Sequence, residues 1–200
     1  MKNLRNVLVL LLLAVIVAGC NPDSNSESEE SANSTNSTNS STKEEPLQNL
    51  MEKYPKVEST WQGLPEEFRK KVIMPQVSTF PFKVDDIQVL TVAAGVLPPG
   101  VKTNFDVMYK AKNSFPRIHV TTFDVDGQEP SFGAYKDKVE LNKGIVGYYS
   151  EKAEETEISW LSEDNSVQYN IRYKDGVDGK DSITKEKLTE IANSMIKQTK

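Results

Sequence analysis

The chain has 200 residues, 37% of them hydrophobic, with 24 basic residues against 29 acidic ones and a net charge of −5. This length allows one folded domain with a tail. The acidic balance disfavours nucleic acid as a partner, because phosphate binding requires a positive surface. The single cysteine excludes a disulfide within the chain.

Residues 1–19 have the layout of a secretory signal peptide. Lys2 and Arg5 precede an uninterrupted apolar run over 7–18, and small residues lead to Cys20. The run is shorter than the ~20 apolar residues of a transmembrane helix. Residues 17–20 resemble the lipobox of bacterial lipoproteins. The resemblance implies cleavage before Cys20 and lipid attachment to its thiol, with acyl chains such as palmitate holding the chain on the extracytoplasmic face of the cell membrane. The alternative is an ordinary signal peptide followed by an incidental cysteine.

Residues 20–45 begin with the lipidated cysteine and continue almost entirely in Asn, Ser, Thr and Glu. A segment with so few apolar side chains has little to bury, so the composition predicts a disordered tether. The Asn-X-Ser/Thr triplets at Asn33, Asn36 and Asn39 are interpreted as solvated linker, because the lipobox points to a bacterial cell.

Residues 46–75 are predicted to form a short helical segment. Apolar positions spaced for one helix face favour a helix from Pro46 to just before Pro55, and a second helix fits 65–73. Trp61, between the two, either stacks on a ligand or packs their junction, and packing is the favoured interpretation.

Residues 76–200 change to the alternating pattern of strands, and strands are expected at 87–93, 105–109, 117–125, 139–141, 145–149, 157–161 and 167–173. Turn signals at 126–127, 142–144 and 163–165 predict three hairpins. Short connections make the sheet antiparallel, with one packed face and one polar, wet face.

A closing amphipathic helix is expected to cover the packed face. Its start is capped by Ser182 or Thr184. Its apolar stripe consists of Leu188, Ile191, Ala192, Met195 and Ile196. The predicted fold class is therefore α+β, an antiparallel sheet packed on a C-terminal helix, preceded by the short helical segment and the tether.

Several short stretches carry a family resemblance over about 80–197. They are Phe80-Pro-Phe82, Ile158-Ser-Trp160, the hairpin leading to Tyr169, and the ending at 188–195. The chain resembles a domain of unknown function at the extracytoplasmic end of Gram-positive lipoproteins and anti-sigma-factor-type membrane proteins. The resemblance implies an extracytoplasmic α+β module, distantly similar to half-barrel lipoprotein carriers, and supplies no catalytic residues. The helical stretch 46–74 lies outside it.

Candidate catalytic and metal residues are sparse. His119 is the only histidine, and a lone His makes no metal cluster. Ser182 and Lys185 have the S-x-x-K spacing of penicillin-interacting enzymes, but the accompanying signatures are absent, so a helix cap is favoured. The acidic loops 124–127 and 175–181 fail the EF-hand pattern, although 175–181 leaves a weak ion site open beside the favoured solvated turn. We therefore expect no catalytic, cofactor or metal residues.

The leading hypothesis is a non-enzymatic, membrane-anchored binding or sensing module of the cell envelope. Its partners would be the membrane, through Cys20, and an unidentified envelope protein or apolar ligand. The alternative is a carrier or chaperone for an apolar ligand, a lipid or a lipoprotein, which should keep a cavity between the sheet and helix 184–199. An envelope hydrolase using Ser182 and Lys185 ranks third.

Overall fold

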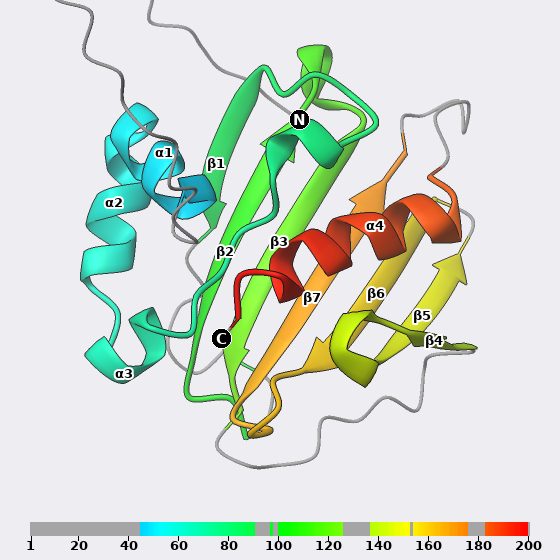
Figure 1. The fold of residues 1–200 in the computed structure, drawn as a ribbon. Helices are drawn as coiled ribbons and strands as arrows, with labels where there is room; N and C mark the ends of the chain where they lie inside the picture. Colours follow the sequence, from blue (N-terminus) through cyan, green and yellow to red (C-terminus); the bar gives the residue numbers. More distant parts are fainter. Residues whose placement is uncertain are drawn as a thin grey trace, which may run out of the picture. The chain divides into compact units, whose positions relative to one another are not determined.

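The computed structural model describes residues 45–90, 97, 100–125, 137–152, 154–175 and 183–199. All of them belong to the unit Ser40–Lys200. Cys20 and the tether predicted over 20–45 lie outside the described residues, except Glu45, which begins the first helix. Seven antiparallel strands form one sheet in the order β1-β2-β3-β7-β6-β5-β4 (Figure 1). The strands are β1 (Asp86–Leu90), β2 (Thr103–Lys110), β3 (Arg117–Asp124), β4 (Asp137–Glu140), β5 (Val146–Lys152), β6 (Glu155–Leu161) and β7 (Val167–Lys174).

Alternation along the strands divides the sheet into two faces. In β2, Phe105, Val107 and Tyr109 are at most 1% exposed and face the core, whereas Asn104 and Asp106 between them are only half-buried. Successive side chains of a strand point to opposite faces, so the same division follows in β3 and β7. The strand predicted at 105–109 is confirmed, although its far half is buried on both faces, because Met108 and Lys110 are only 7% and 8% exposed.

The hairpin predicted at 126–127 is wrong. Residues 126–136 lie outside the described residues, but β3 pairs with β2 and β7, whereas β4 pairs with β5 at the far edge of the sheet. Burial explains why β3 is a central strand. Its side chains Ile118 and Val120 are fully buried, which requires a neighbouring strand on each side. The short β4 is mostly exposed, which suits an edge strand.

The other two predicted hairpins are confirmed. Between β4 and β5, Lys143 has φ 62° and Gly144 φ 71°, and between β6 and β7, Asn165 has φ 55°. Gly and Asn tolerate this left-handed region better than other residues, and that is why their clusters indicated turns.

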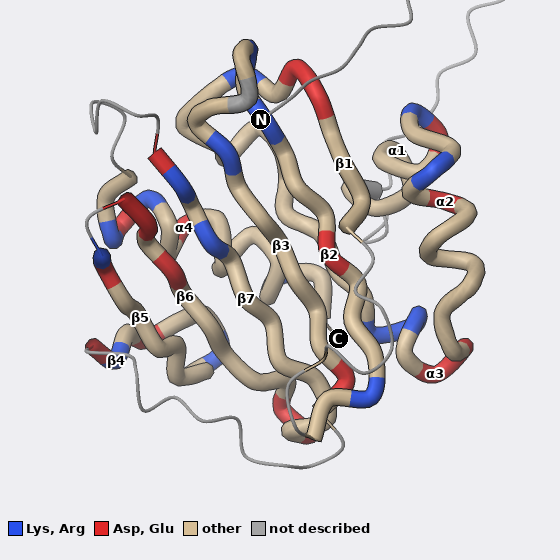
Figure 2. Tube along the Cα trace, turned by 180° about the vertical axis from the view of Figure 1, so that it is seen from behind, with Lys and Arg blue, Asp and Glu red and all other residues tan. Residues whose placement is uncertain are grey.

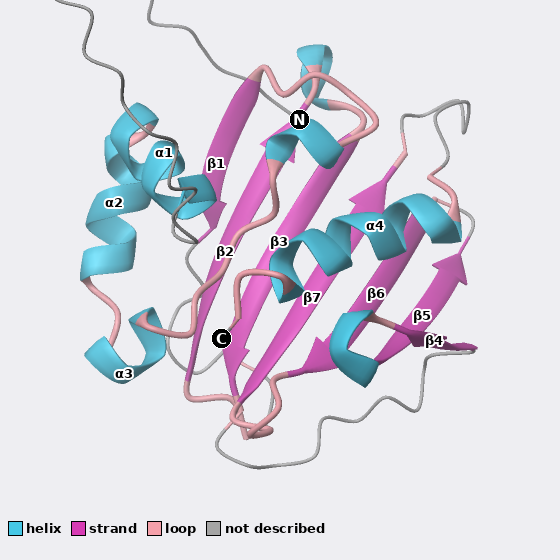
Figure 3. Cartoon of the chain, in the orientation of Figure 1, coloured by secondary structure: helices cyan, strands magenta, loops and turns pink. Residues whose placement is uncertain are grey.

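The closing helix α4 (Lys185–Ile196) crosses one face of the sheet (Figure 3). The Thr184 hydroxyl accepts a hydrogen bond from the Lys187 backbone N–H at 3.2 Å, so Thr184 is the predicted N-cap. Leu188, Ile191 and Met195 are completely buried. The α+β class, with this helix packed on an antiparallel sheet, is confirmed.

The N-terminal segment holds three helices rather than two: α1 (Glu45–Lys53), α2 (Pro55–Gln62) and α3 (Glu66–Arg69). Pro55 was expected to end the helical segment's first helix, but it also occupies the first turn of α2, a position that proline favours. Trp61 therefore lies inside α2 rather than between helices. The helix predicted over 65–73 is shorter, and the chain continues to Val72 and beyond without helical structure.

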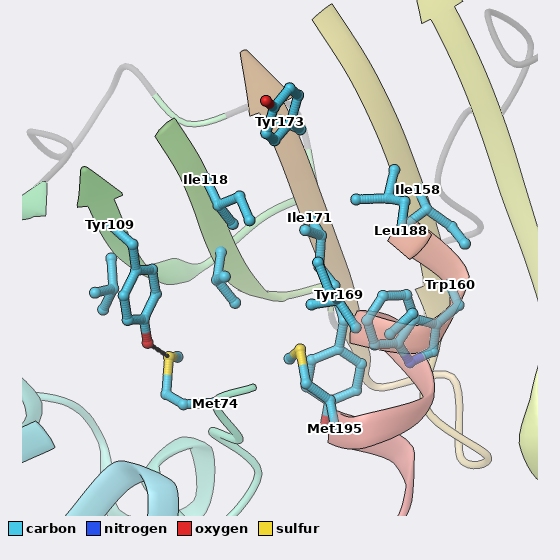
Figure 4. Packing of buried hydrophobic residues seen from close by; sticks show 14 of the residues in the cluster. Met74, Tyr109, Ile118, Ile158, Trp160, Tyr169, Ile171, Tyr173, Leu188 and Met195 are labelled. Carbon is cyan, nitrogen blue, oxygen red and sulfur yellow. Dashed lines mark hydrogen bonds between the residues drawn. The ribbon is translucent and has the colours of Figure 1, made fainter. Parts of the chain in front are cut away.

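One core joins the helical segment to the sheet. Leu50, Val57 and Phe68 from the three helices belong to the same buried cluster as the strand residues. The segment after α3 packs on the sheet through Met74 and Phe80. The Tyr109 hydroxyl lies 3.6 Å from the Met74 sulfur (Figure 4). The rings of Phe80 and Tyr109 are perpendicular, with their centroids 5.0 Å apart. The packed face thus has two covers, α4 and the segment that follows α3.

Candidate functional site

The helix α4 leaves no room for a ligand between itself and the sheet along its apolar stripe. Leu188, Ile191 and Met195 have no exposed surface, and their side chains pack against strand residues (Figure 4). A groove of about 980 Å³ opens instead beside the C-terminal end of α4, where the helical segment faces the ends of β6 and β7. Its volume falls at the upper end of the ~300–1,000 Å³ that ligand pockets occupy.

The inner surface of this groove is aromatic and aliphatic. Trp160 stacks on Tyr169, with ring centroids 5.4 Å apart, and both rings are almost fully buried. The Tyr169 hydroxyl donates to the Lys71 carbonyl at 2.8 Å, which holds the segment after α3 against β7. The remaining apolar lining comes from Leu47, Met51, Trp61, Val72, Ile73, Ile145, Leu161 and Ile196.

The β6–β7 turn closes one end of the groove through an anchored carboxylate. Asp164 accepts hydrogen bonds from the Ser162 hydroxyl at 2.6 Å and the Ser166 hydroxyl at 2.7 Å, and it pairs with Lys71 at 3.0 Å. The hydroxyls of Ser162 and Ser166, followed by Lys71, lower the pKa of Asp164 well below its usual range. The turn therefore keeps its negative charge and fixes residue 71 in place.

Trp61 adds a hydrogen-bond donor to the groove wall. Its indole Nε1 is buried and has no hydrogen-bond partner, and the Arg69 guanidinium lies 5.2 Å from its ring centroid. Arg69 donates weakly to the Gln62 carbonyl at 3.5 Å, and no described carboxylate oxygen lies within 4.0 Å of it. A ligand oxygen would satisfy the indole donor and meet this cation at once.

A second cavity of about 950 Å³ lies along the other side of α4. Its lining alternates charged and amide side chains, including Glu140, Lys185 and Glu190, and offers no aromatic side chain. The Lys185 ammonium in this wall pairs with Asp137 at 3.0 Å and lies 5.1 Å from the Tyr149 ring centroid. The groove beside Trp61 is therefore the better candidate for an apolar ligand.

Figure 2 shows the sheet from the face turned away from α4, which we call the open face. His119 and Asp106 lie on this face. His119 Nδ1 lies 3.9 Å from Asp106 Oδ1, too far for a hydrogen bond, and both side chains are under 20% exposed (17% and 16%). Burial raises the pKa of Asp106 to about 6. Burial, followed by the positive charges of Arg117, Arg172 and Lys174, lowers the pKa of His119 to about 4. At neutral pH the imidazole is neutral and the carboxylate is ionised, so the contact is no ion pair.

The residues considered for chemistry in the sequence do not come together. Cys20 and Ser182 lie outside the described residues, and Lys185 is engaged by Asp137. Of the loop 175–181, only Asp175 is described. Among the described residues, no cluster of three or more His, Cys, Asp or Glu side chains could hold a metal ion. The described helices include none long and apolar enough to cross a bilayer.

Sequence reasoning considered Trp61 but missed its neighbours in the groove. Arg69 was assigned only to the end of a helix, and Trp160 only to packing in a strand. Their approach depends on the contact of the segment after α3 with the β6–β7 hairpin, where Lys71 meets Asp164 and Tyr169, and no local pattern encodes it. The one available signal was the pairing of the chain's two tryptophans with a basic stretch at 69–71.

Comparisons with protein-family models, with curated proteins and with solved structures found no match for this chain. The resemblance of 80–197 to the extracytoplasmic domain of unknown function therefore stays a prediction, as does the lipobox at 17–20.

Proposed function

We propose that the chain is a lipoprotein, held through acyl chains on Cys20 at the extracytoplasmic face of the cell membrane, and that its folded part is a non-enzymatic binding module. The apolar run over 7–18 and the small residues before Cys20 support the anchor. The polar composition of 21–45 supports a tether that lets the folded part reach ligands beyond the headgroups.

The ligand we propose is an amphiphile with one apolar chain and an oxygen-bearing head, such as a fatty acid. The observation that carries this proposal is the buried, unpartnered N–H of Trp61 beside Arg69, in a groove that combines apolar side chains with charged ones. A carboxylate placed there would accept from the indole and lie against a cation that has no described carboxylate partner. The chain would extend over Trp160, and each buried methylene would contribute about 0.8 kcal/mol.

The apolar lining also supports the carrier alternative, now with the groove beside α4 as the site of the cargo. The two roles differ in release, since a carrier delivers its ligand to a second acceptor. Transfer of the fatty acid from the loaded protein to vesicles, faster than its spontaneous release into buffer, would favour the carrier.

Both tryptophans of the chain line the groove, so their fluorescence reports its occupancy. We expect palmitate brominated on its chain to quench the full-length protein in non-ionic micelles, saturably and reversibly on addition of unbrominated palmitate. Trp61→Phe keeps an apolar ring without the N–H, and Arg69→Gln removes the cation. Each should weaken binding about tenfold, because each deletes one polar contact worth ~1–2 kcal/mol.

Lys56→Gln is the matched control. It removes the same positive charge as Arg69→Gln, but from an exposed position on α2. It should bind the fatty acid as the wild type does. Quenching that never saturates, or that is unaffected by both groove variants, would refute the proposed ligand.

The anchor has its own test. Cys20→Ala should abolish incorporation of radiolabelled palmitate and release the protein from the membrane fraction or leave its signal peptide uncut. Equal labelling of Cys20→Ala and wild type would show that the thiol is not the lipid attachment site.

A further inference from the structure

Three cations stand directly opposite one another on neighbouring strands. In the sheet register Lys110 of β2 pairs with Arg117 of β3, and Arg117 pairs with Lys174 of β7. All three lie on the open face, because their sequence neighbours Tyr109, Ile118 and Tyr173 face the core. Like charges directly opposite across a strand pair are destabilising. The pairing of the strands therefore does not explain this row.

Lys110 and the neighbouring Arg172 are paired with carboxylates, whereas Arg117 and Lys174 have no such pair among the described residues. Lys110 Nζ lies 2.5 Å from Asp86, and Arg172 lies 3.3 Å from Glu155 and 3.4 Å from Glu157. Glu155 is also opposite Lys174, yet it is engaged by Arg172.

Arg117 and Lys174 are the two cations of the row without a carboxylate partner. Among the described residues, no carboxylate oxygen lies within 4.0 Å of their side-chain nitrogens. The Arg117 guanidinium lies over the Phe115 ring at 4.7 Å, and its Nε is buried without a hydrogen-bond partner. Stacking on the ring fixes the guanidinium plane and leaves its charge uncompensated.

The pKa of the neighbouring His119 is affected by these cations. His119 is two residues from Arg117 on the same face and directly opposite Arg172, with Asp106 and Met108 beside it on β2. After burial, the charges of Arg117, Arg172 and Lys174 are the causes that lower its pKa.

We propose that Arg117 and Lys174 bind a phosphate group on the open face of the sheet. A guanidinium presents a planar fork that matches two oxygens of an oxyanion, and an ammonium supplies a point charge to a third. Two uncompensated cations suit a phosphate monoester, which carries about −1.5 to −2 at neutral pH, better than a carboxylate. The site is separate from the groove, and its failure would leave the fatty-acid proposal standing.

The chain holds one histidine, so a single imidazole signal reports on this site. NMR titration of His119 in the full-length protein, in non-ionic micelles, should be repeated with inorganic phosphate and with chloride at equal ionic strength. A bound anion favours the imidazolium, so phosphate should raise the pKa of His119 by about 0.5 or more relative to chloride.

Lys174→Gln and Arg117→Gln should each raise the pKa of His119 without any ligand, by removing a positive charge, and should then abolish the further rise with phosphate. Arg117→Lys, which keeps the charge, should retain part of the response. Lys56→Gln, with the same loss of charge on exposed α2, should behave as wild type. An absent phosphate response in the wild type, or a full response in both glutamine variants of the row, would overturn the proposal.

Free phosphate and a lipid headgroup share this chemistry, and one further arm separates them. Phosphatidic acid mixed into the micelles supplies the same monoester on a membrane component. A rise in the His119 pKa at lower total phosphate with the lipid than with the free ion assigns the headgroup as source, and the reverse order assigns the free ion.

Discussion

The two faces of the sheet use the same strands for opposite purposes. On the packed face of β3, Ile118 and Val120 are completely buried against the core. On the open face of the same strand, Arg117, His119 and Thr121 meet polar and charged partners. Apolar contact dominates the packed face, although the Thr122 hydroxyl there is buried without a hydrogen-bond partner. The open face leaves the Nε of Arg117 and a carboxylate oxygen of Asp106 buried without hydrogen bonds.

This difference indicates where stability and binding are concentrated. Burial of apolar surface supplies most of the favourable free energy of folding, so the packed face should tolerate little change. Unpartnered buried polar groups cost stability, and natural proteins retain few of them. We therefore expect substitutions on the packed face to unfold the protein and substitutions on the open face to alter its response to ligands and pH.

Two phenylalanines on adjacent strands give the largest expected contrast. Phe105 on β2 is 1% exposed on the packed face, and Phe123 on β3 is half-buried on the open face. Phe105→Ala should lower the free energy of unfolding by about 3–5 kcal/mol through lost burial and a cavity. Phe123→Ala should cost about 1 kcal/mol.

Urea denaturation followed by circular dichroism measures both free energies. Equal costs for the two variants would mean that the open face is covered as completely as the packed one, and the comparison of the faces would fail.

Most of the packed face could be predicted from the sequence, because it depends on local periodicity. Alternation in β2 and β7 and the stripe of α4 assigned Tyr109, Ile171 and Ile191 to the core, and the structure places all three there. The order of the strands could not be predicted, since the partner of β3 is set by burial across the whole sheet rather than by the turn after it.

The sites were harder to predict for the same reason. The opposition of Arg117 and Lys174 exists only in the register of β3 with β7, and the groove exists only where the segment after α3 meets the β6–β7 hairpin. Neither arrangement leaves a motif of fixed spacing in the chain. Pro55 added to the difficulty, because a proline suits both the end of one helix and the first turn of the next.

The pH dependence of stability offers a contrast within the open face. The pKa of Asp106 is raised to about 6, so the folded state binds its proton more tightly and loses stability as pH rises from about 4 to 6. The pKa of His119 is lowered to about 4, so the unfolded state binds its proton more tightly and the folded state gains stability as pH rises from about 4 to 6.5. The two contributions oppose each other in the wild type.

Removing one partner at a time should therefore produce opposite slopes. Relative to wild type, Asp106→Asn should become more stable as pH rises through this window, and His119→Gln should become less stable. Unfolding free energies at several pH values between 4 and 6.5 give both differences, and taking differences from the wild type cancels the other carboxylates. Slopes of the same sign in the two variants would contradict the assigned directions of the pKa shifts.

The smallest expected effect on stability comes from Lys174→Gln. Lys174 lies between Arg117, which repels it, and Glu155, whose carboxylate is held by Arg172. Removing its charge relieves one opposed pair and loses a weak attraction, so the free energy of unfolding should change by under ~0.5 kcal/mol. The same substitution should abolish the phosphate response of His119. Since the cation contributes so little to folding, a loss of stability above about 1 kcal/mol would instead assign Lys174 to the fold and remove the main reason for placing an anion beside it.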